Sequence, residues 1–90
     1  MPDLSIILPT CNRAEHLLNT IMEIERRTHI DFELIVVDGA STDSTSDVLQ
    51  LAHSILGNHL RVIREPKREG FVRAVNKGFR AATSPFITWI

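Results

Sequence analysis

The sequence predicts an α/β fold in which a mainly parallel sheet lies between two layers of helices. Short apolar runs rich in β-branched residues recur along the 90 residues, and segments with helical apolar spacing separate them. Polar or charged loop residues follow the first three of these runs. Strands that alternate with amphipathic helices favour a parallel sheet with right-handed crossovers. We therefore expect the order β-α-β-α-β-α-β in a Rossmann-like, three-layer α/β/α arrangement.

The first strand is expected at residues 4–8 (LSIIL), a run that Pro9 closes. Asn12 is then the expected N-cap of a helix, with Glu15 as its capping-box partner three residues later. Apolar residues at helical spacing predict that one face of this helix packs on the sheet: Leu17, Leu18, Ile21, Met22 and Ile24. The helix should end near Thr28.

The second strand is expected at residues 32–38 (FELIVVD), whose uninterrupted β-branched run is typical of a central parallel strand. Ser44 and Asp47 predict a second capping box, at the start of the next helix. Gly57 is expected to end that helix in a left-handed conformation. The apolar stripe of the helix should consist of Val48, Leu49, Ala52, Ile55 and Leu56.

The last third of the chain predicts a third strand at residues 60–64 (LRVIR), a charged loop (EPKREG) and a third helix. The expected apolar face of this helix comprises Phe71, Ala74, Val75, Phe79 and Ala82. Residues 84–90 (SPFITWI) open a fourth strand, at which the sequence stops. We expect a domain that is incomplete at its C-terminal end. The fourth strand should be an uncovered apolar edge through which the isolated chain self-associates.

Composition and charge argue against several classes of function. The net charge of −1 gives no indication of a nucleic-acid partner. No apolar stretch approaches the roughly 20 residues of a membrane span, and the N-terminus lacks a signal-peptide pattern. We therefore expect a cytoplasmic location, and this expectation includes attachment at the inner face of the membrane. Cys11 is the single cysteine, so no internal disulfide can form.

Cysteine and histidine chemistry is not expected either. We expect the four histidines on helices or loops at the far side of the sheet, away from Cys11: His16, His29, His53 and His59. Without a partner histidine, Cys11 is a poor candidate for a nucleophile. No cysteine and histidine spacing indicates a zinc site.

Candidate binding residues gather where parallel strands end, because ligands of open sheets bind beyond the carboxyl ends of the strands. Residues 9–13, 38–43 and 65–70 should meet there. Asp38 can accept hydrogen bonds from ribose hydroxyls or a base N–H, and a turn role is its alternative. Arg13 is placed to meet phosphate oxygens. A dinucleotide fold would need G-x-G-x-x-G after the first strand, where this chain has PTCNR.

The remaining candidates have strong structural alternatives. Ser41 lies in a hydroxyl-rich loop that most simply turns into the second helix. Asp43 and Asp47 together suggest a metal, but capping of that helix is the better interpretation. The charged residues Lys67, Arg68 and Arg73 are most simply a solvated rim. Gly70, Ala74 and Gly78 predict close packing of the third helix, within which Asn76 has no evident structural reason.

Three blocks of the sequence together resemble a known family. SIILPTCNRAEHLLNTI, DFELIVVDGASTDST and GFVRAVNKGFRAATSPFITWI resemble the opening blocks of the family 2 glycosyltransferases, which are inverting enzymes of the GT-A fold. The resemblance covers nearly the whole chain. It implies that residues 1–90 are the N-terminal nucleotide-sugar-binding part of a glycosyltransferase domain, ending before the metal-binding Asp-x-Asp-type motif. The residues that it implies for the donor site are Pro9, Thr10, Asn12, Arg13, Asp38, Ser41, Gly70 and Asn76, with Thr42, Asp43 and Gly78 in the same motifs.

The resemblance also implies a reaction and its partners. A nucleotide-diphosphate sugar would be the donor, and a saccharide, lipid or other hydroxyl compound the acceptor, in cell-wall or polysaccharide biosynthesis. A divalent cation, Mg²⁺ or Mn²⁺, would neutralise the diphosphate in the complete enzyme while a deprotonated hydroxyl displaces it. No catalytic residue is identified in these 90 residues.

Two positions depart from the family pattern. Cys11 stands where the family often has an aromatic residue. Gly39 stands where the family often has a second acid, so one base-recognising carboxylate is missing from the pattern. A non-catalytic nucleotide- or protein-binding module and a nucleotidyltransferase-like enzyme are the alternative functions.

Overall fold

The computed structural model describes residues 2–90 and has the predicted order of strands and helices. The element bounds are β1 Leu4–Thr10, α1 Ala14–Arg27, β2 Phe32–Asp38, α2 Thr45–Leu56, η1 Gly57–His59, β3 Leu60–Arg64, α3 Phe71–Ala81 and β4 Phe86–Trp89. The single turn of 3-10 helix, η1, is an addition to the prediction.

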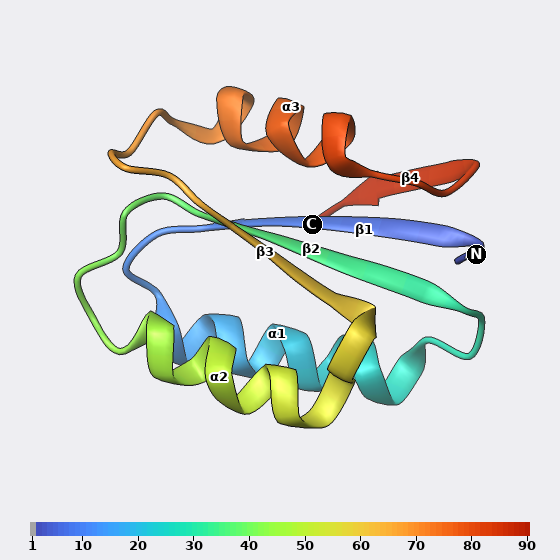
Figure 1. Cartoon of the computed structure of the whole chain (residues 1–90). Coiled ribbons are helices and arrows are strands. Elements are labelled where there is room, and N and C mark those ends of the chain that lie inside the picture. Colours follow the sequence, from blue (N-terminus) through green and yellow to red (C-terminus); the bar gives the residue numbers. More distant parts are fainter. Residues whose placement is uncertain (1) are drawn as a thin grey trace.

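The described strands form one parallel sheet in the order β3-β2-β1-β4. Helices α1 and α2 cover one face of this sheet and α3 lies over the other (Figure 1). The predicted three-layer α/β/α fold is therefore confirmed. The chain runs outward from β1 through β2 to β3 and then returns to the other side of β1 for β4. This reversal creates a topological switch point at the carboxyl ends of β1 and β4, where sheets of this kind bind ligands.

Two apolar cores hold the layers together. All seven residues of β2 are buried, as predicted for a central strand. Because side chains alternate along a strand, Leu34 and Val36 pack in the larger core under α1 and α2, whereas Ile35 and Val37 pack under α3. The predicted helix residues that are buried in the larger core are Leu17, Ile21, Ile24, Leu49, Ala52 and Leu56.

The prediction that the whole apolar stripe of each helix is buried is wrong for several large residues at its margins. Met22 and Ile55 are exposed, because they lie beside the stripe that faces the sheet. Phe71 and Phe79 of α3 are also exposed. Small residues instead bring α3 onto the sheet: a Cβ on Gly78 would overlap the side chain of Ile7. The predicted close packing through small residues is therefore confirmed at Gly78.

Strand β1 extends two residues beyond the predicted end at Leu8. Thr10 accepts a hydrogen bond from the Gly39 N–H at 2.8 Å, so Thr10 faces β2, while Ile7 accepts one from the Ile90 N–H on the opposite side. The backbone of Pro9, like that of Ile7, therefore faces the β4 side, at a position beyond the last pair of β1 with β4. Proline has no N–H, so β1 cannot donate a ladder hydrogen bond toward β4 at this position, which lies just past the last β1–β4 pair.

The two predicted capping boxes are wrong. Helix α1 begins at Ala14 with Arg13 as its N-cap, and neither α1 nor α2 has a side-chain hydrogen bond from its N-cap residue. Asn12 lies outside the helix, at φ 53°, a left-handed conformation that asparagine tolerates better than most residues. Ser44 does occupy the N-cap position of α2. Gly57 has the predicted positive φ, at 56°.

Strand β4 is the predicted uncovered edge. Within the described part of the chain it pairs with β1 alone, and its four residues are all exposed, with Phe86 at 71%. The exposed side chains of Phe86 and Trp89 therefore make the β4 edge of the sheet apolar. Among residues 2–90, no helix combines the length and the apolar character that crossing a membrane requires.

Candidate functional site

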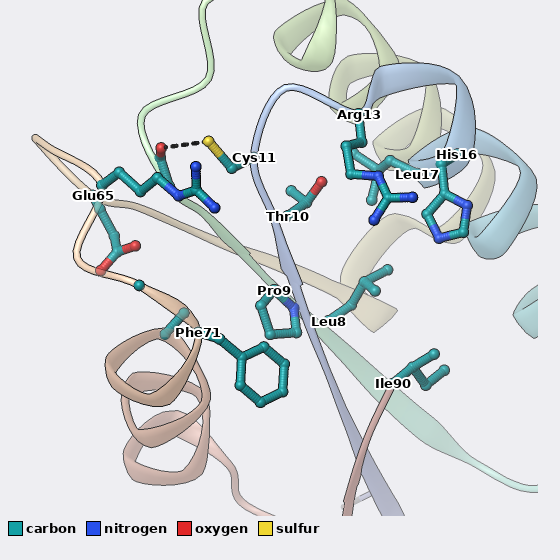
Figure 2. A pocket seen from close by; sticks show the side chains of 14 residues that line it. Leu8, Pro9, Thr10, Cys11, Arg13, His16, Leu17, Glu65, Phe71 and Ile90 are labelled. Carbon is teal, nitrogen blue, oxygen red and sulfur yellow. Dashed lines mark hydrogen bonds between the residues drawn. The ribbon is translucent and has the colours of Figure 1, made fainter.

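A pocket of about 350 Å³ opens at the carboxyl ends of the strands, beside the switch point (Figure 2). The three segments that the sequence predicted to meet do meet there. The lining residues are Leu8, Pro9, Thr10, Cys11, Arg13, His16, Leu17, Gly39, Glu65, Arg68, Gly70, Phe71, Ala74 and Ile90. They come from β1 and its loop, the start of α1, the loops after β2 and β3, the start of α3, and the residue that follows β4.

The chemistry of the pocket combines cationic groups with apolar walls. Arg13 and His16 project toward it from the start of α1, and Phe71 and Glu65 lie across from them (Figure 2). Arg68 adds a second guanidinium. Guanidinium groups match phosphate oxygens in pairs of hydrogen bonds, and apolar walls with a few polar groups suit a small organic ligand. The pocket therefore suits a small anionic molecule that also has an apolar part.

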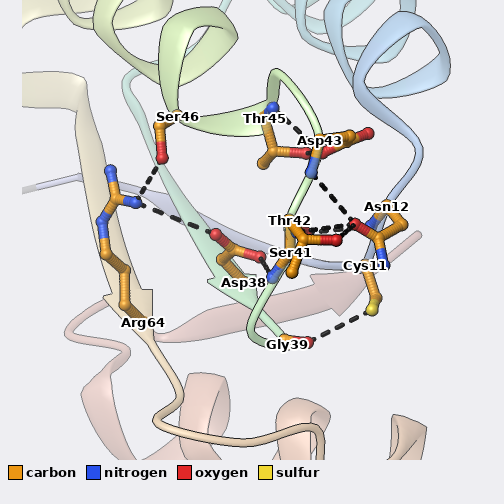
Figure 3. Close-up of polar contacts among 10 residues, drawn as sticks. All are labelled: Cys11, Asn12, Asp38, Gly39, Ser41, Thr42, Asp43, Thr45, Ser46 and Arg64. Carbon is orange, nitrogen blue, oxygen red and sulfur yellow. Dashed lines mark hydrogen bonds and ion pairs between the residues drawn. The ribbon is translucent and has the colours of Figure 1, made fainter.

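Beside the pocket, the loops after β1 and β2 are joined by hydrogen bonds of Asn12 (Figure 3). Asn12 Oδ1 accepts from the Thr42 N–H at 2.7 Å and from the Asp43 N–H at 3.3 Å. The Asn12 N–H donates to Ser41 Oγ at 2.9 Å. These contacts explain the left-handed backbone of Asn12, which turns its side chain toward the second loop instead of its own helix.

Asp43 caps both neighbouring helices. Its Oδ2 accepts from the Ala14 N–H of α1 at 3.1 Å, and its Oδ1 accepts from the Thr45 N–H of α2 at 3.0 Å. The hydrogen bond from the Thr45 hydroxyl is the main cause that holds the pKa of Asp43 below its usual value. A carboxylate at a helix N-terminus is favourable because it meets unpaired N–H groups and the positive end of the dipole. The capping interpretation of Asp43 is therefore confirmed.

Asp38 ends β2 with its carboxylate directed into the loop that follows. The residue is only 3% exposed. Its Oδ1 accepts from the Ser41 N–H at 3.1 Å, and its Oδ2 lies 3.9 Å from Arg64 Nη1 (Figure 3). Asp38 thus has the turn role that was its structural alternative, and it lies next to the pocket without lining it.

The predicted site residues fall into three places. Pro9, Thr10, Arg13 and Gly70 line the pocket. Asn12, Asp38 and Ser41 belong to the hydrogen-bonded loops beside it. Asn76 is exposed on α3, apart from the residues that line the pocket.

Sequence reasoning placed His16 wrongly and did not select Glu65, Arg68 or Phe71 for the site. His16 follows Arg13 by three residues, and this spacing puts both on one face of the helix start, at the pocket. Glu65 follows β3 as Asp38 follows β2, which was an available signal. Arg68 was interpreted as part of a solvated rim, yet it lines the pocket.

A metal centre is not formed by the described residues alone. Within residues 2–90, no three side chains of histidine, cysteine, aspartate or glutamate come close enough together to hold an ion. Residues 2–90 therefore do not by themselves supply a full set of such ligands for the divalent cation that the family resemblance implies for the complete enzyme.

The fold and the pocket define an α/β protein with a pocket at the switch point of a parallel sheet, and the chemistry of this pocket suits a small anionic ligand. The chain belongs to the glycosyltransferase family 2: the sequence profile described as Glycosyl transferase family 2 matches residues 5–90. A PGL/p-HBAD biosynthesis glycosyltransferase of Mycobacterium bovis is 40% identical over 89 residues, which are 99% of this chain and 33% of that protein. The putative teichuronic acid biosynthesis glycosyltransferase TuaG of Bacillus subtilis is 28% identical, over 99% of this chain and 35% of its own length. The chain thus spans about a third of the length of these relatives.

Solved structures confirm the predicted GT-A-type fold. The mannosyltransferase PcManGT from Pyrobaculum calidifontis, in complex with GDP-Man and Mn²⁺, is 29% identical with a TM-score of 0.74, over 91% of this chain and 25% of that one. TarS of S. aureus in complex with UDP has a TM-score of 0.81 at 24% identity, over 98% of this chain and 26% of that one. The likeness to TarS supports the fold alone.

Proposed function

We propose that residues 1–90 form the N-terminal, nucleotide-sugar-binding part of a family 2 glycosyltransferase domain. The observation that supports this most strongly is the pocket at the carboxyl ends of the strands, which Arg13 and Arg68 line together with apolar walls. A nucleotide-diphosphate sugar offers both the anionic groups and the planar base that such a pocket suits.

The lining residues have distinct proposed roles. Arg13 binds diphosphate oxygens, and Pro9 and Thr10 form the floor under the nucleoside. Gly70 stands at the N-terminus of α3 with φ 94°, where unpaired backbone N–H groups favour an anion. A side chain with a Cβ would be strained in that conformation.

Residues outside the lining support the pocket. Asn12 and Ser41 hold the loops after β1 and β2 together, and Asp38 fixes Ser41 by accepting a hydrogen bond from its N–H. The proposed role of Asn76 near the diphosphate-sugar rests on the family motif alone, because its side chain is exposed apart from the pocket.

The proposed activity of the whole enzyme is transfer of the sugar, with inversion, to a hydroxyl of a saccharide, lipid or other acceptor. A divalent cation, Mg²⁺ or Mn²⁺, is part of this proposal, and the complex of PcManGT with GDP-Man and Mn²⁺ supports it. We propose a cytoplasmic location that includes the inner face of the membrane, where nucleotide-activated sugars would be met; the relative named for teichuronic acid biosynthesis supports a role in polysaccharide synthesis.

Calorimetric titration tests the proposed function directly. UDP, GDP and ADP are each titrated into the chain, with and without Mn²⁺, and at least one is expected to bind. Arg13→Ala should weaken that binding about tenfold, because a charge-assisted contact with phosphate is lost. Lys67→Ala is the matched control, since Lys67 is an exposed cation that does not line the pocket. Absence of binding for all three nucleotides would refute the proposal.

We also propose that the chain self-associates through β4, with a second copy as the partner. An exposed apolar edge strand offers unpaired backbone groups and apolar side chains to another edge. In sedimentation velocity, the wild-type chain should form dimers or larger species at tens of micromolar, and Phe86→Lys should be monomeric. Met22→Lys, on an exposed apolar residue of α1, is the control and should behave as wild type. A monomeric wild type at every concentration would contradict this proposal.

A further inference from the structure

Glu65 is a buried carboxylate in the wall of the pocket. It follows the last residue of β3, and its N–H donates to the Asp38 carbonyl at 2.9 Å. Its side chain is only 1% exposed, yet Glu65 lines the pocket. Burial of a carboxylate is unfavourable unless polar groups surround it. The partners of its two oxygens therefore indicate what the carboxylate can still bind.

One oxygen of Glu65 is held from the α3 side. Lys77 Nζ donates to Glu65 Oε2 at 2.6 Å and to Glu69 Oε1 at the same distance. The hydrogen bond to Glu65 is the largest of the causes that raise the pKa of Lys77, so Lys77 keeps its positive charge. Lys77 therefore fixes the orientation of the Glu65 carboxylate.

The other oxygen faces the space beside Gly39. A Cβ on Gly39 would lie 3.5 Å from Glu65 Oε1, 3.5 Å from Cys11 Cβ and 3.4 Å from the Thr10 carbonyl oxygen. Because glycine has no side chain, this space is open, and Thr10, Cys11 and Gly39 all line the pocket. Oε1 is thus a carboxylate acceptor at the β2 and β3 side of the pocket, remote from Ile90 at the β4 side.

Asp38 is less well placed to contact a ligand. Its Oδ1 already accepts from the Ser41 N–H, and the residue does not line the pocket. Of the two acids at the ends of β2 and β3, Glu65 is therefore the one whose side chain borders the open space.

We propose that Glu65 Oε1 accepts a hydrogen bond from a nucleobase N–H and thereby selects uracil; this assignment depends on the proposed donor site. A carboxylate only accepts hydrogen bonds, so it favours a base edge that presents an imino N–H. Uracil presents one such group, N3–H. Guanine presents two adjacent N–H groups, which pair best with both carboxylate oxygens at once, and Lys77 holds Oε2 from the α3 side, so only Oε1 borders the open space. At the same ring position cytosine has an unprotonated acceptor, N3, which a carboxylate oxygen repels, and its only donor on this edge is the N4 amino group beside it.

The test compares UDP with CDP, which share the ribose and the diphosphate and differ only in the base. The wild-type chain is expected to bind UDP at least tenfold more tightly than CDP in calorimetric titrations. Glu65→Gln keeps the size of the side chain but can turn an amide N–H₂ toward the base. This variant should bring the UDP-to-CDP affinity ratio close to one, mostly through weaker UDP binding.

Glu69→Gln is the matched control, because Glu69 contacts Lys77 at the same distance but does not line the pocket. It should keep the wild-type preference for UDP. Two results would overturn the assignment: an unchanged ratio in Glu65→Gln, or an equal loss of preference in Glu69→Gln, which would trace the effect to Lys77. If the wild type binds some nucleoside diphosphate without preferring UDP, only this assignment fails. If it binds none, the proposed function fails as well.

Discussion

Replacement of Glu33 by alanine is expected to lower the free energy of unfolding by about 3 kcal/mol. Glu33 lies in β2 and is only 5% exposed. Its Oε2 accepts from the Ser5 hydroxyl at 2.5 Å and from the Thr83 N–H at 2.7 Å, and its Oε1 accepts from Arg61 Nη1 at 3.2 Å. One carboxylate therefore joins β1, β3 and the connection from α3 to β4. Without it, the buried Ser5 hydroxyl and the part-buried Thr83 N–H lose their acceptor, which costs more than the hydrogen bonds themselves contribute.

Urea unfolding followed by circular dichroism measures this effect, and Glu23→Ala is the control. Glu23 is a glutamate of α1 whose side chain is 49% exposed, although it pairs with Arg26 and Arg27. Exposed ion pairs are screened by solvent and contribute roughly 0–1 kcal/mol. If the two alanine variants were destabilised equally, the Glu33 hydrogen bonds would contribute nothing beyond an exposed ion pair, and the prediction would be wrong.

Acid should reproduce part of the Glu33→Ala effect. Burial pushes the pKa of Glu33 upward, but hydrogen bonds from Ser5, Thr83 and Arg61 outweigh it, so the pKa lies below the usual value of 4.5. A carboxyl group whose pKa is lower in the folded state contributes stability above its unfolded pKa and loses it as the pH falls through the folded pKa. Glu33→Gln should therefore flatten the decline in stability below about pH 5.

The regular elements could be predicted because their signals are local. Leu34 to Val37 is an unbroken apolar run, and only a strand covered on both faces buries all four residues. In the helices, the positions that directly face the sheet, such as Leu17 and Leu49, were predicted correctly. Met22 and Ile55 were not, because periodicity alone does not show how wide the buried stripe is.

The loops could not be predicted in detail because their partners are distant in sequence. Asn12 and Glu15 match a capping box, yet Asn12 bonds to Thr42, 30 residues away. In the same way, Glu65 reaches the pocket only because β2 lies between β1 and β3 and Gly39 leaves the space open. A pattern read along the chain does not contain these contacts, although it does identify which loops meet.

Replacement of Asp38 by alanine is expected to weaken binding of a nucleoside diphosphate by ~1–3 kcal/mol, or roughly fivefold to 150-fold. The Asp38 carboxylate accepts the Ser41 N–H, and Ser41 Oγ in turn accepts the Asn12 N–H at the edge of the pocket. Loss of the first contact should loosen the second, so the loop that carries Arg13 is no longer held in a binding conformation. Calorimetry with UDP measures the change, and unchanged affinity would count against any part for Asp38 in the site.

Asp38→Asn separates the two ways in which Asp38 can act. The asparagine oxygen still accepts the Ser41 N–H but carries no charge, so we expect affinity near that of the wild type. A loss as large as that of Asp38→Ala would instead mean that the charge itself reaches the nucleotide. Asp31→Ala is the control, because Asp31 is an exposed aspartate directly before β2, at the opposite end of the sheet. Its backbone carbonyl accepts the Asp3 and Leu4 N–H groups, and its half-exposed side chain lies 3.7 Å from His59 Nδ1 at that same end, so truncation of the side chain should leave UDP binding unchanged.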